Sequence, residues 1–115
     1  MLAFAGCGSS GRGSDLAAVC KAQRASLASA PQPVGLRGAA EVLRRVVTMD
    51  TELRAAVDDE AVTARIDRLD QNARRALAAI QNTDPDRSMF PLRTGAASGR
   101  RVLSAARSLL NDACG

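Results

Sequence analysis

The residues best suited to chemistry in this sequence are three cysteines, at positions 7, 20 and 114. A cysteine thiol can bind a metal ion, form a disulfide or carry a covalently attached group. A structural zinc site takes four ligands drawn from cysteine and histidine. Because the chain holds three widely spaced cysteines and no histidine, we expect no metal site.

The absence of histidine also removes most of the side-chain pairs that enzymes use. Histidine is the commonest general base, and Ser–His and Cys–His pairs activate many catalytic nucleophiles. The Glu-x-x-His motif of di-iron bundles cannot form without it. A haem would find neither histidine nor tyrosine as its ligand. The sequence therefore favours a protein that is not an enzyme and that carries no cofactor.

Carboxylates are the remaining candidates for acid–base or metal chemistry. Asp58, Asp59 and Glu60 are adjacent, but a calcium loop needs six or more oxygen ligands at a different spacing. We interpret them as the N-cap and first turn of a helix, where the helix dipole favours negative charge. Asp50 falls among the apolar positions of a predicted helix. We expect it at the edge of the buried stripe, paired with Arg54; the alternative is a buried contact that fixes helix register.

Arginine side chains account for most of the positive charge, and the net charge of the chain is +4. Six arginines occur as adjacent pairs within predicted helices: Arg44 with Arg45, Arg74 with Arg75, and Arg100 with Arg101. Together these pairs could form a belt that binds phosphate or other anionic groups. Neighbouring residues on a helix point about 100° apart, however, so we favour an ordinary solvated face. No aromatic side chains are interleaved for base stacking, and we do not expect nucleic acid as a partner.

Met89, Phe90 and Leu92 form an apolar group in the segment 85–93, which we expect to be an irregular loop. They could line the mouth of a pocket for a small apolar ligand. They could equally plug the open end of a helical bundle, which is the interpretation that we favour.

The elements that must position these residues are helices. The chain has no tryptophan or tyrosine and two phenylalanines, so a sheet would have few of its preferred residues, whereas alanine, leucine and arginine favour helix. Its 115 residues are typical of one domain. Apolar residues step by three and four along four segments. These are 14–30, 36–57, 59–81 and a last segment that begins near position 94 or 98. We predict an all-α fold, an antiparallel up-down-up-down four-helix bundle.

The N-terminal residues Phe4-Ala5-Gly6-Cys7 precede a stretch rich in glycine and serine that ends at Ser14. This arrangement resembles the lipobox and tether of small bacterial lipoproteins from GC-rich genomes such as those of actinobacteria. The resemblance implies that Cys7 receives the lipid. We therefore assign residues 1–13 to a residual signal peptide, lipobox and flexible tether, and residues 14–115 to the bundle domain.

With Cys7 assigned to the lipid, Cys20 and Cys114 remain as an even pair in an oxidising compartment. In an up-down-up-down bundle, the start of the first helix and the end of the fourth lie at the same end. Cys20 and Cys114 occupy these two places, so we predict one disulfide between them. Two buried and unlinked thiols are the alternative.

We conclude from the sequence that the protein is a non-enzymatic lipoprotein module, anchored through Cys7 to the outer face of the cell membrane, or secreted if the lipobox is not used. It is expected to bind a protein or an anionic partner of the cell envelope through a helical surface. One alternative function is a carrier of a small apolar ligand in the bundle core. Another is a basic helical protein that binds nucleic acid.

Overall fold

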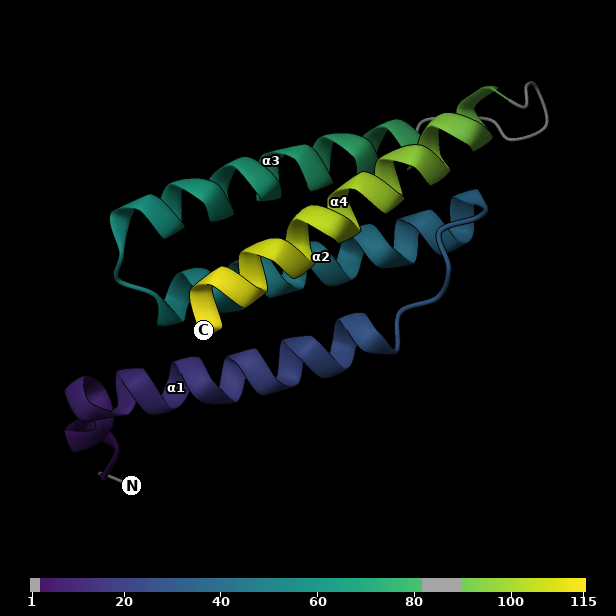
Figure 1. The fold of residues 1–115 in the computed structure, drawn as a ribbon. Coiled ribbons are helices and arrows are strands. Elements are labelled where there is room, and N and C mark those ends of the chain that lie inside the picture. The colour runs from purple at the N-terminus through teal and green to yellow at the C-terminus, as the bar shows by residue number, and fades with distance from the viewer. Residues whose placement is uncertain (1–2, 82–89) are drawn as a thin grey trace.

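The computed structural model describes the backbone of residues 3–81 and 90–115, and the side chains of residues 16–81 and 97–115. Over these ranges the chain forms four helices and no strands: α1 (Ala3–Ala28), α2 (Leu36–Ala56), α3 (Glu60–Gln81) and α4 (Phe90–Cys114). Successive helices alternate in direction along the long axis of the molecule (Figure 1). The prediction of an all-α helical bundle is confirmed.

Helices α2 and α3 lie close to their predicted limits, and the acidic residues between them act as predicted. The backbone amide of Val62 donates a hydrogen bond to Oδ1 of Asp59 at 3.0 Å. Asp59 is therefore the N-cap of α3, and Glu60 lies in the first turn, where a carboxylate is favoured by the helix dipole.

The other two helices begin earlier than the sequence predicted. Helix α1 starts at Ala3 rather than near Ser14, and so spans the expected boundary between tether and domain. Each glycine in this stretch disfavours helix, but extending an existing helix needs no new nucleus. Helix α4 starts at Phe90, so residues 90–93 of the expected loop 85–93 are helical, and the rest of that loop lies outside the described residues. Pro91 fits this start, because proline is tolerated in the first turn of a helix.

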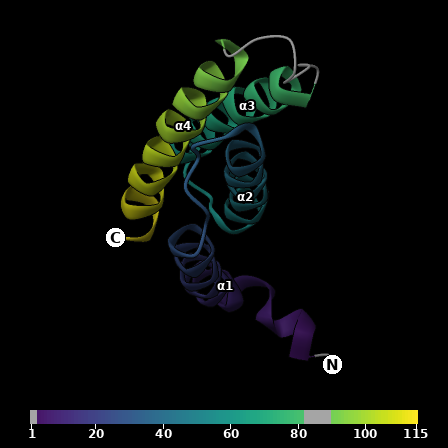
Figure 2. The ribbon, with the colours of Figure 1, turned by 90° about the vertical axis from the view of Figure 1, so that its right-hand side faces the viewer.

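Helix α2 lies at the centre of the bundle. It packs against α1, α3 and α4, and α4 also contacts α1 and α3 (Figure 2). Within the described part of the chain, α1 makes no contact with α3. Helices α2 and α4 therefore pack against each other, and both α1 and α3 pack against this pair.

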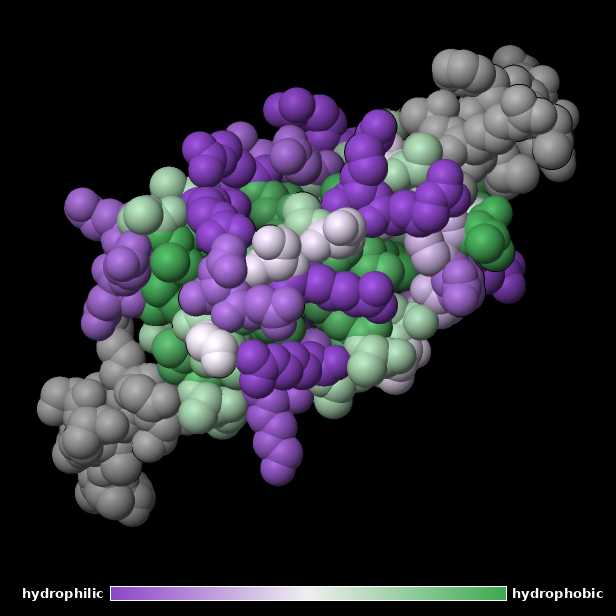
Figure 3. All heavy atoms as spheres, viewed as in Figure 1, coloured by the Kyte–Doolittle hydropathy of each residue, from purple (hydrophilic) through white to green (hydrophobic). Residues whose placement is uncertain are grey.

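The core reflects this central position of α2. Its buried side chains cover more than one stripe of the helix: Ala39, Ala40, Val42, Leu43, Val46, Met49, Asp50, Leu53 and Ala56. Helix α1 buries Cys20, Gln23 and Leu27 among its described side chains. On the face seen in Figure 3, long hydrophilic side chains lie across the surface and apolar ones are visible between them. Aliphatic stems of arginine can cover a thin core in this way.

Small residues allow α4 to approach α2 closely. A Cβ atom on Gly99 would lie 2.9 Å from Cβ of Pro33 and 3.3 Å from Cβ of Ala39, closer than ordinary van der Waals contact. Ala39, Ala73 and Ala106 are fully buried. These small side chains allow the helices to pack closely at these points.

The predicted disulfide is present. Cys20 on α1 is bonded to Cys114 at the end of α4, and their Cα atoms are 6.1 Å apart. The bond closes a loop with a sequence separation of 94 residues. It joins α1, which buries few of its described side chains, to the last turn of α4.

Replacing Cys20 and Cys114 together by serine is expected to lower the free energy of unfolding by up to about 4–5 kcal/mol, because the unfolded chain loses a long cross-link. Urea denaturation followed by circular dichroism measures the change. Cys7→Ser is the control and should leave the unfolding curve where it is. Equal stability of the oxidised protein and the double variant would contradict a stabilising role for the bond.

Candidate functional site

A buried carboxylate on α2 is the least expected group in the core. The Asp50 side chain is 1 % exposed, and neither Oδ1 nor Oδ2 accepts a hydrogen bond from any group in the described part of the chain. The expected pairing with Arg54 is wrong, because Nη1 of Arg54 instead lies 2.7 Å from Oδ1 of Asp67 on α3. Asp50 is buried because α2 has helices on three sides, so this position lies under α3 rather than at an edge.

Asp50 lines a hollow of about 370 Å³ between α2 and α3, which we call the α2–α3 hollow. It is open to solvent and is lined by Asp50, Thr51, Arg54, Ala55, Ile66, Asp67, Asp70 and Arg74. Nε of Arg74 is 2.9 Å from Oδ2 of Asp70. The hollow thus holds three carboxyl groups and two guanidinium groups, and the two guanidinium groups are each paired with an exposed or half-buried aspartate.

Burial strongly alters the acidity of Asp50. The pKa of its carboxyl group is raised from 3.8 to about 8, chiefly because the group is removed from water. The negative charges of Asp70 and Asp67 contribute to this rise, and the positive charge of Arg74 opposes it. At neutral pH Asp50 is therefore mostly protonated and uncharged.

The arginine pairs predicted from the sequence do not lie together. Nη1 of Arg45 donates hydrogen bonds to the Ser26 carbonyl at 2.7 Å and to Oγ of Ser29 at 2.9 Å, which ties the end of α1 to α2. Its Nε donates to Glu41 at 3.0 Å. Nη1 of Arg44 is 3.8 Å from the same carboxylate. Arg45 thus has a structural role in joining α1 to α2, whereas the ion pair of Arg44 lies within α2.

The pairs on α3 and α4 divide between separate surfaces. Arg75 and Arg101 line a hollow of about 530 Å³ between α3 and α4, the α3–α4 hollow. Arg100 and Arg107 line another, of about 340 Å³, beside the loop that joins α1 to α2. We call the hollow lined by Arg100 and Arg107 the loop–α4 hollow. None of these four arginines forms an ion pair with a residue that the structure describes.

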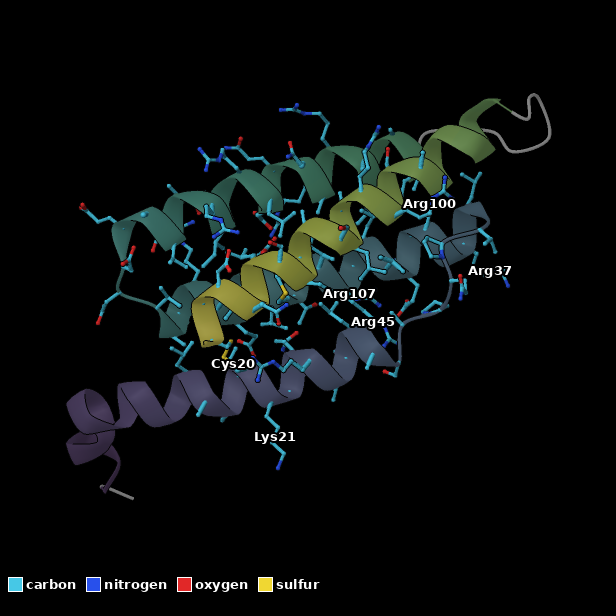
Figure 4. The ribbon with its side chains drawn as sticks, in the orientation of Figure 1. Cys20, Lys21, Arg37, Arg45, Arg100 and Arg107 are labelled. Carbon is cyan, nitrogen blue, oxygen red and sulfur yellow. A yellow bond between two sulfur atoms is a disulfide. The ribbon has the colours of Figure 1, made fainter. Side chains whose placement is uncertain are left out.

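Sequence reasoning missed Arg107. Figure 4 places Arg100 and Arg107 on the side of α4 that faces the start of α2 and the end of α1, where Arg37 and Arg45 also lie. The two α4 arginines are seven residues apart, which is close to two helical turns and puts both on one face. Adjacency in sequence drew attention to Arg101 instead, although it points to the other side of the helix.

Several predicted site residues lie outside the part of the structure that describes side chains. These are Cys7, the proposed lipid acceptor, and Met89, Phe90 and Leu92, the proposed pocket mouth. Among the side chains that are described, no group of three or more potential ligands could hold a metal ion. In the same part of the chain, no helix is long and apolar enough to cross a membrane.

Comparison with models of protein families, with curated proteins and with solved structures finds no match for this chain.

The pKa of Asp50 gives a prediction for stability against pH. The folded state keeps a proton that the unfolded chain releases, so the stabilisation is complete below pH 3.8 and is lost as the pH rises to about 8. Asp50→Asn mimics the uncharged form and should abolish this loss. At pH 9 we expect the variant to be more stable than the original protein by up to about 6 kcal/mol, since each pKa unit corresponds to about 1.4 kcal/mol.

Urea denaturation of both proteins between pH 5 and 9 measures this difference. Glu52→Gln, on the exposed side of α2, is the matched control and should behave as the original protein does. Parallel stability curves for Asp50→Asn and the original protein would show that Asp50 titrates normally.

Proposed function

We propose that the protein is a lipid-anchored module outside the cytoplasmic membrane that binds an anionic partner of the cell envelope. The surface that would bind is the loop–α4 hollow with Arg100 and Arg107. The observation that carries this proposal is the presence there of two exposed arginines on one helix face that form no ion pair with described residues. By contrast, Arg54, Arg65 and Arg74 each form an ion pair with an aspartate.

The chemistry around these arginines suits an anion that also carries some apolar surface. A guanidinium group presents a planar set of donors that matches a carboxylate or a phosphate. Between the two arginines the hollow is lined by Leu103 and Ser104, and on its other side by the loop residues. Val34 in that loop is 72 % exposed. It offers an apolar contact next to the positive charge.

The proposed compartment is supported by the disulfide and by the lipobox resemblance. Disulfides persist in oxidising environments such as the exterior of a bacterial membrane. The first turns of α1 lie beyond the end of the other three helices (Figure 1). A lipid on Cys7 would therefore attach the protein at one end of the bundle and leave the loop–α4 hollow accessible.

Binding through this surface should depend on charge and on position. Replacing Arg100 and Arg107 by alanine is expected to weaken binding of an oligoglutamate peptide or a phosphate-bearing glycan polymer at least tenfold. Raising the salt concentration should weaken binding by the unchanged protein, because exposed charges are screened within about 8–10 Å at physiological ionic strength. Fluorescence anisotropy measures both effects.

Arg75→Ala with Arg101→Ala is the matched control, since it removes the same charge from the α3–α4 hollow. It should reduce binding much less. If the two double variants lose affinity equally, binding depends on net charge alone and the assignment to the loop–α4 hollow fails.

The anchor can be tested in the cells that make the protein. Cys7→Ser should move the domain from the membrane fraction to the soluble or secreted fraction, because two or three acyl chains hold a protein firmly and none can attach to serine. Immunoblotting of fractionated cells measures the shift. Cys20→Ser with Cys114→Ser is the control and should not release the protein. Unchanged membrane association of the Cys7 variant would show that Cys7 is not the anchor.

A further inference from the structure

The α2–α3 hollow is lined by Asp50, whose carboxyl group has no hydrogen-bond partner in the described structure. The two oxygen atoms of Asp50 are buried and without hydrogen-bond partners, yet the residue lines a hollow that opens to solvent. Leaving a buried polar group unpaired costs about 1–3 kcal/mol, and more if it is charged. A group that enters the hollow from outside could remove this cost.

We propose that the α2–α3 hollow binds a primary ammonium group on a short alkyl chain, with the Asp50 carboxylate as its counter-ion.

The charges that line the hollow call for one cation. Asp67 is paired with Arg54, and Asp70 with Arg74. Each of these two ion pairs has no net charge, so Asp50 is the one carboxyl group lining the hollow that has no basic partner. When Asp50 is ionised the hollow carries one net negative charge, and a single monovalent cation neutralises it.

The shape and the remaining lining favour an alkylammonium over a metal ion. The residues described here contain no set of three ligands for a metal. Ile66 and Ala55 supply an apolar wall for a short chain. The Thr51 hydroxyl donates its hydrogen to the Val47 carbonyl at 3.1 Å, which leaves its oxygen free to accept from an ammonium group. A volume of about 370 Å³ lies at the low end for ligand pockets and suits a small molecule or one side chain.

Binding must release the proton of Asp50. The free protein holds this carboxyl group protonated below pH 8, in the presence of Asp67, Asp70, Arg54 and Arg74. An ammonium ion binds the ionised form, so one proton passes to solvent for each cation bound. The apparent affinity should therefore rise about tenfold per pH unit up to about pH 8, and fall again near pH 10 as the amine loses its own proton.

The test uses the complete disulfide-bonded chain. Butylammonium chloride is titrated at pH 8 into isotopically labelled protein, with sodium chloride at the same concentration as the reference. Two-dimensional NMR should give saturable shifts at amides of residues that line the hollow. Asp50→Asn should weaken this binding at least tenfold, and Glu52→Gln should leave it unchanged. Calorimetry in buffers of different ionisation enthalpy should find close to one proton released at pH 6.5.

Two further probes distinguish the sources of such a group. Butane-1,4-diamine represents a free amine, and a short peptide with a single lysine represents a side chain of a partner protein. Saturable binding at Asp50 by either supports the site and identifies which source fits it better. If none of the three amines gives saturable shifts at the hollow, or if Asp50→Asn binds them equally well, the proposal is overturned.

Discussion

Helix α2 has neighbours on three sides, and the burial that this imposes on its side chains governs the rest of the structure. Small residues at the contacts, such as Ala39 and Ala40, let the other helices come close enough to exclude water. The same closeness places Asp50 out of contact with solvent and keeps its carboxyl group protonated at neutral pH. A packing requirement of the fold therefore places an uncharged carboxyl group in its described core. This group lines the α2–α3 hollow.

Helix α1 depends on a different set of interactions. Within the described part of the chain it packs on α2 and α4 alone, and its described side chains contribute few buried groups to the core. Two connections compensate for this: the disulfide from Cys20 to Cys114, and the hydrogen bonds from Arg45 to the last turn of α1. Both connections lie in the second half of α1: the disulfide is at Cys20, and the hydrogen bonds reach Ser26 and Ser29 at its C-terminal end. The surface that we assign to binding lies beside the second connection, where the loop after α1 meets α4.

Much of the fold could be predicted from the sequence, because helix periodicity and cysteine position are local or countable signals. The limits of α2 and α3, the Asp59 cap and the disulfide followed from them. The site could not be predicted in the same way. Apolar residues that step by three and four identify one buried stripe on α2, whereas contact with three helices buries a wider surface that includes Val42 and Met49. This wider burial decides whether Asp50 lies at the edge of the buried surface or within it. Adjacent arginines drew attention to pairs that the helix separates, and away from Arg107.

Enclosure of α2 by its three neighbouring helices keeps Asp50 buried and uncharged. The pKa of the Asp50 carboxyl group can be measured directly by NMR, from the chemical shift of the carboxyl carbon in protein labelled with ¹³C at aspartate side chains. The Asp50→Asn variant assigns the signal. We expect a midpoint of about 8. A midpoint close to the ordinary value of 3.8 would mean that Asp50 is solvated or paired, and would contradict both the packing around α2 and the binding site that we infer from it.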